Sequence, residues 1–449
     1  MNSLDSILKS YTVSFDELVV RNKLLGAGFV VTNKNGIIYE GAAGRLAFAQ
    51  GSAPFTTQSL VWLASMTKLP TAVAALQLVD RGLLAMDQDL RPLMPELGVL
   101  EILRGFSTPK EEDGGSPILD PNTRPITLRH MLTHTLGLSM DLPDPDLMRW
   151  SRYVGRTAVN LDWTRAGITT PLSFAPGEGW KYGMAYDWAG AVLEVLTKQT
   201  LGEWMQGHIF TPLRMERTGF WPEQILGNRR SNEEEEGEDD RLLEFAFSAE
   251  DGITGNRPYP DAELRPGTSI LRTEHEMESG GAGLFSTTHE YELFLSGLLR
   301  SSSSDASSSP AGQSDPQGEP LLQPQTLTQL LTPQLTPPQR AHLESAVAGF
   351  HVGLGPEFPA DGSVRLDHGL GGLMNLDNLP GKRRAGSMTW SGMSNGRWWV
   401  DPQTGIAAAL FTGVLPHGNA VVGRLWDELE RAVYGDLLPE LKKKKKDAR

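Results

Sequence analysis

Ser65 and Lys68 are the first residues of this chain whose types and spacing could do chemistry. The run Ser65-Met-Thr-Lys68 has a helical pattern, and residues three apart share one face of a helix, so the amine can reach the hydroxyl. A serine hydroxyl attacks a carbonyl only after a neighbour takes its proton, and a lysine in a dry pocket can do so because desolvation lowers its pKa. The pair therefore indicates covalent catalysis through an acyl-serine. By itself S-x-x-K is a weak signal, and a helix cap with an exposed lysine is its ordinary explanation.

Tyr182 supplies the context that the serine and lysine need. It follows a loop with Pro176, Gly177 and Gly179, and it precedes a helix that begins near residue 186. A phenol near an ammonium group has its anion stabilised, so this tyrosine can act as a general base for the serine. Taken alone, it would be an ordinary loop aromatic anchored on the core. Taken together, the three residues predict a catalytic site.

A second serine, Ser394, lies in a formal G-x-S-x-G motif, Gly392-Met-Ser-Asn-Gly396, with Asp401 and His417 further along the chain. That order is typical of an α/β-hydrolase triad, in which the serine sits between a strand and a helix. The residues that follow the motif have the pattern of another strand, and too little chain remains for that fold. We therefore do not expect Ser394 to be the nucleophile.

Two other motifs could be mistaken for functional sites. His130 and His134 have the spacing of a zinc pair, but Met131 replaces the glutamate of H-E-x-x-H and no third ligand is evident, which favours capping or core histidines. The run Gly369-Leu-Gly-Gly372 lacks the strand-then-helix frame of a dinucleotide loop, which favours close backbone packing. We expect neither a metal nor an organic cofactor.

The elements that must position these residues can be predicted from the hydrophobic pattern. Two β-branched runs around Asn35-Gly36 predict a hairpin. A helix over 65–81 ends at Gly82, a frequent stop residue. The other expected elements are a helix at 4–22, helices and Pro-rich loops over 83–218, strands at 386–390, 396–401 and 405–411, and a helix at 421–434.

The predicted strands lie at both ends of the chain. They indicate one antiparallel sheet built from residues 1–60 and 270–436 and flanked by helices. The mostly helical region between them, 61–269, carries Ser65, Lys68 and Tyr182. The sequence therefore predicts an α+β architecture.

Three segments differ from the rest in composition. Residues 228–240 and 301–320 contain too little apolar surface to pack, and we expect them to be disordered insertions. Residues 437–449 form a basic tail with five consecutive lysines, Lys442 to Lys446. A frayed, solubilising end is favoured over a nuclear or anionic-lipid signal for this tail.

The overall composition excludes several function classes. The chain has 449 residues, of which 39% are hydrophobic and 21% charged, as in an ordinary globular protein. It has no cysteine, so disulfides, thiolate catalysis and Cys-ligated zinc are excluded. Much of the net charge of −14 lies in one acidic run, and the sequence shows no basic face of the kind that binds nucleic acid. Neither a signal peptide nor a membrane span is evident, so we expect a cytoplasmic protein with no membrane partner.

In the order and spacing of its motifs, the chain resembles the superfamily of serine β-lactamases, penicillin-binding proteins and family VIII esterases. Its spacing is also similar to that of lovastatin-type polyketide acyltransferases. The resemblance extends over residues 16–434 and implies a β-lactamase/transpeptidase-like fold. Its markers are Ser65-Met-Thr-Lys68, Ile126-Thr-Leu-Arg-His-Met-Leu-Thr-His134-Thr-Leu-Gly-Leu138, the block from Pro176 to Gly190, and Ser279-Gly-Gly-Ala-Gly-Leu-Phe-Ser286.

The third active-site element of that family is a Lys-Thr-Gly strand in β-lactamases, and Trp390-Ser391-Gly392 is the matching strand here. The family's fold implies that the backbone N–H groups of Ser65 and Met393 form the oxyanion hole, since two donors must point at the developing negative oxygen. The resemblance therefore implies that Trp390, Ser391, Gly392 and Met393 contact the substrate.

Two residues depart from the β-lactamase pattern. Met184 stands where the tyrosine motif usually has Asn, and Trp390 stands where the strand usually has the lysine that grips a β-lactam carboxylate. Both replace polar recognition by apolar surface, to which Trp398 or Trp399 would add more for an acyl chain. The pattern favours neutral esters or hydrophobic acyl groups over β-lactams, as in the acyltransferase and esterase branches.

The motifs and the resemblance together predict an enzyme that moves an acyl group from an ester or thioester, through acyl-Ser65, to a small-molecule alcohol. Lys68 and Tyr182 would relay the protons, the donor could be free or bound to a carrier protein, and the setting would be secondary metabolism. Two alternatives stay open: a carboxylesterase that admits water to the same site, and a non-catalytic ligand-binding protein of the same fold. The intact Ser65, Lys68 and Tyr182 weigh against the second, because a pure binding protein has no need of all three.

Overall fold

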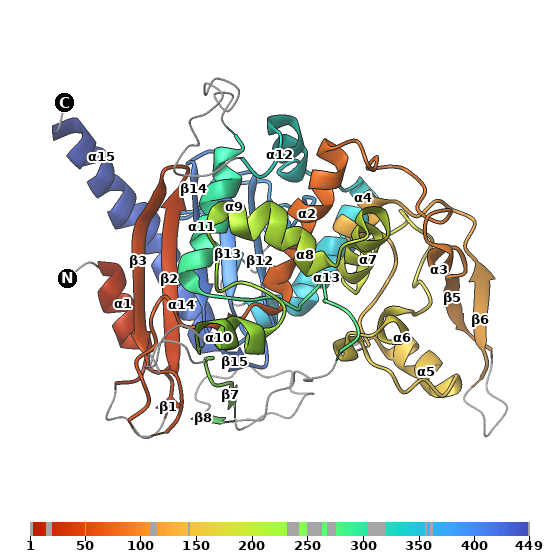
Figure 1. Cartoon of the computed structure of the whole chain (residues 1–449), viewed down its shortest axis with the longest axis horizontal. Helices are drawn as coiled ribbons and strands as arrows, with labels where there is room; N and C mark the ends of the chain where they lie inside the picture. Colours follow the sequence, from red (N-terminus) through yellow and green to blue (C-terminus); the bar gives the residue numbers. More distant parts are fainter. Residues whose placement is uncertain are drawn as a thin grey trace.

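A seven-stranded antiparallel sheet forms the centre of the molecule, in the strand order β10-β11-β12-β13-β14-β2-β3 (Figure 1). Its strands are β2 (Gly26–Asn33), β3 (Gly36–Gly44), β10 (Leu366–His368), β11 (Leu373–Asn375), β12 (Ser387–Ser391), β13 (Arg397–Asp401) and β14 (Ile406–Phe411). Because the N-terminal hairpin β2–β3 pairs with the C-terminal strand β14, the sheet is assembled from both ends of the chain, as predicted.

The computed structural model describes residues 3–14, 20–49, 51–107, 115–141, 144–230, 242–248, 263–266, 275–302, 320–354, 357–359 and 362–447. Within these ranges, no helix is both long and apolar enough to cross a membrane.

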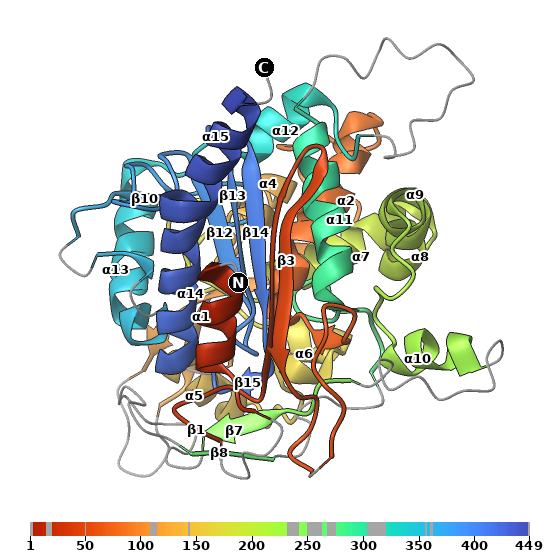
Figure 2. The ribbon, with the colours of Figure 1, turned by 90° about the vertical axis from the view of Figure 1, so that its left-hand side faces the viewer.

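Helices cover both faces of the central sheet (Figure 2). On one face lie α1 (Ser3–Tyr11) and α14 (Ala420–Ala432), and on the other lie α2 (Lys68–Asp80) and α11 (Thr288–Arg300). Helix α11 approaches β2 so closely that a Cβ at Gly28 would lie 2.4 Å from the Thr288 hydroxyl oxygen. The glycine therefore allows this helix to pack directly on the strand.

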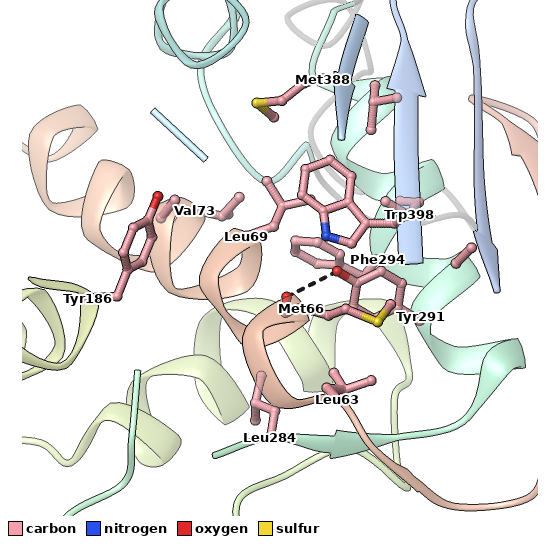
Figure 3. Packing of buried hydrophobic residues seen from close by; sticks show 14 of the residues in the cluster. Leu63, Met66, Leu69, Val73, Tyr186, Leu284, Tyr291, Phe294, Met388 and Trp398 are labelled. Carbon is pink, nitrogen blue, oxygen red and sulfur yellow. Dashed lines mark hydrogen bonds between the residues drawn. The ribbon is translucent and has the colours of Figure 1, made fainter. Parts of the chain in front are cut away.

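The start of α2 is held on the sheet by a cluster of buried side chains from helices and strands that are far apart in the sequence (Figure 3). Its labelled members include Leu63, Met66, Leu69, Met388, Trp398, Tyr291 and Phe294. The Tyr291 hydroxyl adds a polar link by donating to the Met66 carbonyl at 3.2 Å. Full burial of an apolar side chain of this size contributes roughly 1.5–3 kcal/mol. The position of the Ser65 turn relative to the sheet is therefore strongly determined by packing.

Between residues 61 and 269, the described part of the chain consists mostly of helices and loops. Besides η1 (Ala64–Thr67) and α2, its helices are α3 (Pro95–Gly98), α4 (Leu128–Leu132), α5 (Pro145–Tyr153), η2 (Asn160–Asp162), α6 (Arg165–Ile168), α7 (Ala185–Thr197), α8 (Leu201–Met205), η3 (Gln206–Phe210), α9 (Thr211–Leu213) and α10 (Pro222–Arg230). The region also contains a hairpin that the pattern did not predict, β5 (Glu101–Phe106) with β6 (Pro117–Pro121). The prolines that bound β6 hid its strand pattern, since proline is typical of loops.

Several short elements complete the described fold. The strands are β1 (Val20–Arg21), β4 (Val61–Trp62), β7 (Ala246–Ser248), β8 (Glu263–Pro266), β9 (Phe285–Ser286) and β15 (Val414–Leu415), and the helices are α12 (Pro324–Leu330), α13 (Pro337–Leu354), η7 (Val433–Leu437) and α15 (Leu438–Asp447). Strand β4, which leads into the turn that carries Ser65, pairs with β9.

The N-terminal helix is shorter than the predicted 4–22. It ends at Tyr11, because Thr12 forms a bridge with Leu24 and β1 pairs with β8. Thr12 and Val13 are β-branched, which disfavours a helix and suits extended backbone. The helical spacing of the apolar residues beyond Tyr11 is a coincidence, because Thr12 lies in a bridge and Val20 in a short strand.

The basic tail also differs from the prediction, and most of the two predicted insertions lies outside the described residues. A frayed tail is wrong for residues 438–447, which form helix α15, because Leu438 and Leu441 pack against the core while Lys442, Lys443 and Lys444 are exposed. The first predicted insertion begins inside α10, which ends at Arg230. Residues 231–240 and 303–319 of the two insertions lie outside the described residues.

Candidate active site

A strained turn presents Ser65 at the start of its helix. Strand β4 leads into Ala64, whose φ of 47° lies in the left-handed region. A residue with a Cβ rarely adopts this conformation, which costs on the order of 1–3 kcal/mol and is found mainly at functional sites. The 3-10 helix η1 (Ala64–Thr67) then continues into α2, and Ser65 stays partly exposed. Sequence reasoning missed Ala64, because nothing in its side chain signals its backbone conformation.

The structure brings the three predicted catalytic side chains together. The Oγ of Ser65 lies 2.6 Å from the hydroxyl oxygen of Tyr182, and the Nζ of Lys68 donates to the same Oγ at 3.0 Å. Lys68 is only 5% exposed, and its ammonium lies 4.8 Å from the centre of the Tyr182 ring. It also donates to the Gly281 carbonyl at 2.7 Å. This geometry allows a proton to pass from the serine to the tyrosine without further movement.

The loop before Tyr182 is held against the segment that ends the second family marker. The Lys181 N–H donates to the His134 carbonyl at 2.9 Å. On the other side of the tyrosine, a Cβ at Gly183 would lie 2.4 Å from the Leu138 carbonyl oxygen. The marker segment therefore positions Tyr182, a role that its residue types did not reveal.

Two buried histidines stand behind Tyr182. The ring of His134 lies 4.7 Å from the Tyr182 ring and 5.4 Å from the ring of His368. Burial, reinforced by His368 and Lys68, holds the pKa of His134 well below its usual range, and burial lowers the pKa of His368 to about 4. Both rings are therefore neutral at physiological pH. In the described part of the chain, no group of three or more His, Asp or Glu residues is placed to hold a metal ion.

The end of β12 packs directly against the turn that carries the serine. A Cβ at Gly392 would lie 2.3 Å from the Leu63 carbonyl oxygen, and one at Gly396 would lie 2.7 Å from the Met66 sulfur. The two glycines permit this approach, and Met393 lies between them in the chain. The oxyanion hole made by the N–H groups of the serine and Met393 remains a prediction, which this packing supports.

Ser394 is placed as a structural residue. It is 1% exposed, and its hydroxyl donates to the Trp62 carbonyl at 2.9 Å. The residues after the motif form strand β13, whereas a nucleophile elbow requires a helix there. The G-x-S-x-G pattern is therefore explained by the docking of the β12–β13 turn on the serine's helix.

The strand residues Trp390 and Ser391 have different partners. The Trp390 ring lies 5.3 Å from the Tyr182 ring, whereas the Oγ of Ser391 lies 2.9 Å from the Nε2 of His417. Burial and the Arg397 guanidinium lower the pKa of His417 to about 3, so its imidazole is neutral. The Ser391–His417 pair was not foreseen, because its members are 26 residues apart and no motif links them.

The apolar surface expected from Trp398 or Trp399 does not line the site. Both are 0% exposed: Trp398 lies in the cluster of Figure 3, and Trp399 packs against Tyr434. Consecutive strand residues point to opposite faces, and a helical layer covers each face of this sheet. Among the partly exposed apolar residues, Trp390 lies against the Tyr182 ring, and Met393 packs on a cluster that contains Ala64, the residue before the serine.

Lys181 and Arg397 lie close to the site residues in the sequence, and each forms an ion pair. The Nζ of Lys181 lies 2.6 Å from a carboxylate oxygen of Asp144. The Nη1 of Arg397 lies 3.1 Å from a carboxylate oxygen of Glu357, and both of these side chains are buried. Neither cation is therefore free to bind a substrate carboxylate.

Known proteins resemble this chain over most of its length. Residues 14–428 match the family described as Beta-lactamase. The chain is 30% identical over 426 residues to a lovastatin esterase of Penicillium rubens, covering 94% of this chain and 97% of that protein. It is 30% identical over 380 residues to a monacolin J acid methylbutanoyltransferase of Aspergillus terreus, covering 83% of this chain and 81% of that protein.

The fold has the same relatives. The structure resembles that of the LovD6 mutant of simvastatin synthase (LovD) from Aspergillus terreus, with a TM-score of 0.76 and 28% identity over 93% of this chain and 91% of that chain. This match, together with the family match, confirms the predicted α+β fold of the β-lactamase/transpeptidase type.

Proposed function

The chain belongs to the beta-lactamase family, as a serine acyltransferase or esterase, and we propose that it transfers an acyl group from a small ester or thioester to an alcohol through acyl-Ser65. The observation that carries this proposal is the set of contacts at Ser65, with Tyr182 at 2.6 Å and Lys68 at 3.0 Å. A pure binding site has no use for a hydroxyl held between a phenol and an ammonium.

Acylation begins when Ser65 Oγ attacks the carbonyl carbon of the donor. Its proton passes to the Tyr182 oxygen, and the Lys68 ammonium stabilises the negative charge that the tyrosine carries as base. The carbonyl oxygen becomes an oxyanion that accepts hydrogen bonds from the backbone N–H groups of Ser65 and Met393. When the intermediate collapses, the bond to the leaving group breaks and that group takes the proton back from Tyr182.

Deacylation reverses these steps with a new partner. The acceptor alcohol gives its proton to Tyr182 and attacks the acyl carbon, and Ser65 leaves with that proton. If water replaces the alcohol, the same site hydrolyses the ester. The apolar rim formed by Trp390 and Met393 favours a hydrophobic alcohol over water, which is the reason for placing transfer first. Hydrolysis is the second candidate, favoured by the similarity to lovastatin esterase over 94% of the chain.

We propose a neutral substrate pair of secondary metabolism. Lys181 and Arg397 are held in ion pairs, so neither of these two cations is available to pair with a substrate carboxylate. A small-molecule thioester or ester is therefore the proposed donor and a neutral, hydrophobic alcohol the proposed acceptor, and the setting in secondary metabolism follows the similarity to monacolin J acid methylbutanoyltransferase.

Mass spectrometry of the intact protein tests this function. The protein is incubated with p-nitrophenyl butyrate or with a butyryl thioester of N-acetylcysteamine, and cyclohexanol is then added. We expect one butyryl group on the wild-type protein, located on Ser65 by peptide mapping, and butyrylated alcohol in excess over butyrate after the addition. Ser65→Ala should acquire no butyryl group. An unlabelled wild-type protein, or a label on another residue, would contradict the proposal, and butyrate as the dominant product would make the enzyme an esterase.

A further inference from the structure

Asp187 is a buried carboxyl group that the steps above do not use. It lies in the first turn of α7 and is 1% exposed. One carboxyl oxygen accepts hydrogen bonds from the Ser279 hydroxyl at 2.5 Å and from the Gly281 N–H at 3.3 Å. The other, Oδ2, is buried without a hydrogen-bond partner among the described residues. A carboxyl group is rarely buried in this way without a reason.

The partners of Asp187 belong to the turn that holds the lysine. The Gly281 carbonyl accepts the hydrogen bond from Lys68 at 2.7 Å, so one residue connects the carboxyl group to the ammonium. The preceding carbonyl, of Gly280, accepts a hydrogen bond from the Thr71 hydroxyl at 2.8 Å. A Cβ at Gly281 would lie 2.6 Å from the Oδ2 of Asp187, so the carboxyl group sits against the glycine itself.

The surroundings of Lys68 explain why a carboxylate is useful there. The groups facing its ammonium are the Ser65 hydroxyl, the rings of Tyr182 and Tyr186 at 4.8 and 5.8 Å, the neutral ring of His134 and the Asp187 carboxyl group. Met184, at the start of α7, contributes no oxygen acceptor. Burial raises the pKa of Asp187, while the Ser279 hydrogen bond and the Lys68 charge act in the opposite direction. The carboxylate and the ammonium therefore stabilise each other.

We propose that Asp187 is a positioning residue of the acyl-transfer site, which holds the Gly281 carbonyl against Lys68 and places a negative charge close to the lysine amine. The inference rests on the proposed function, because it assumes that Lys68 and Tyr182 activate Ser65. Asp187 touches no reacting atom and acts only through the 279–281 turn and through its charge. The close contact between Asp187 and Gly281 also gives a steric reason for the glycine at this position of the fourth family marker.

The variant Asp187→Asn tests the charge while it keeps the shape and the acceptor oxygen. Removal of a negative charge makes a neighbouring ammonium and a neighbouring phenol both release their protons at lower pH. We therefore expect both limbs of the pH profile of kcat/KM for p-nitrophenyl butyrate to move toward lower pH by about one unit. The same shift should appear in the rate at which a fluorophosphonate labels Ser65, which depends on the reactivity of the serine and on no natural substrate.

Glu290→Gln is the matched control. Glu290 is also a buried carboxyl group with a raised pKa due to burial, and it accepts hydrogen bonds from the Thr218 hydroxyl and the backbone N–H groups of Glu216 and Arg217. Glu290 lies in the first turn of α11 and these partners lie between α9 and α10, so none of the contacts involves Lys68 or the 279–281 turn. We expect this variant to lose stability and to keep the wild-type pH limbs.

Ser279→Ala provides a second variant in case Asp187→Asn does not fold. It removes the donor at 2.5 Å and leaves the charge in place, and we expect slower labelling of Ser65 because the 279–281 turn loosens. Unmoved pH limbs in folded Asp187→Asn, or wild-type labelling rates in Ser279→Ala, would overturn the inference. A wild-type protein whose Ser65 is not labelled at any pH would instead refute the proposed function, so the two failures are distinguishable.

Discussion

Two serines of this chain should respond to replacement by alanine in opposite ways. Ser65 is partly exposed and lies 2.6 Å from the Tyr182 hydroxyl, whereas Ser394 is 1% exposed and donates to the Trp62 carbonyl at 2.9 Å. The first is expected to matter for turnover and the second for stability. One pair of variants therefore separates the acyl-serine mechanism from the nucleophile-elbow alternative.

The magnitudes follow from what each hydroxyl does. Ser65→Ala removes the nucleophile, and loss of a serine nucleophile lowers kcat by on the order of 10⁴-fold or more. It should leave the melting temperature unchanged or raise it, because functional groups are often held at some expense of stability. Ser394→Ala leaves the Trp62 carbonyl buried without its donor, which costs about 1–3 kcal/mol. That corresponds to a fall in melting temperature of roughly 2–5 °C.

The assays are steady-state hydrolysis of p-nitrophenyl butyrate and thermal unfolding followed by circular dichroism. We expect Ser394→Ala to keep kcat/KM within about tenfold of the wild-type value, since the β12–β13 turn remains docked by its glycines. A loss of covalent labelling in Ser394→Ala with labelling preserved in Ser65→Ala would refute the reasoning. It would show that the hydrogen bond to Trp62 breaks in solution and that the nucleophile was misassigned.

Three further predictions concern substrate class, composition and pH. Because Met184 and Trp390 leave a substrate carboxylate unpaired, kcat/KM for nitrocefin should be at least about 100-fold below that for p-nitrophenyl butyrate, and an equal value would contradict the apolar site. Deletion of residues 304–318, which spares the buried Ser301 hydroxyl that accepts the Leu322 N–H, should change the melting temperature little, and a large drop would show that the segment packs. The depressed pKa of His368, about 4, means that the unfolded chain binds a proton below about pH 6.5 before the folded protein does, so stability falls as pH drops toward 4. His368→Asn should remove up to roughly 3 kcal/mol of this loss in the free energy of unfolding between pH 6.5 and 4. Urea unfolding measures it, and an unchanged slope of the unfolding free energy against pH would count against a neutral buried imidazole.

Most of the correct predictions came from local sequence patterns. The S-x-x-K spacing places two side chains on one helical face whatever the rest of the fold does, so the Ser65–Lys68 contact was readable from four residues. The Asn-Gly turn of the β2–β3 hairpin and the three C-terminal strands were likewise predicted, because turn chemistry and short apolar runs act within a few residues. The acyltransferase and esterase assignment followed from the order of such local motifs.

Elements whose extent depends on distant partners were predicted less well. The helix at the N-terminus stops at Tyr11 because Thr12 finds a partner in Leu24, and no helical pattern records that bridge. The basic tail is helical because Leu438 and Leu441 find apolar surface on the core. In both cases packing across the fold overrode the local preference.

The residue types alone determined the chemistry of the site: a serine, a lysine and a tyrosine suited to acyl transfer, and tryptophan and methionine where a β-lactamase has polar groups. Only the tertiary structure decided which groups position them. The Gly281 carbonyl reaches Lys68 across 213 residues of sequence, and the Ser394 hydroxyl reaches Trp62 across 332. Contacts over such separations depend on how the sheet closes from both chain ends, and side-chain periodicity carries no information about them.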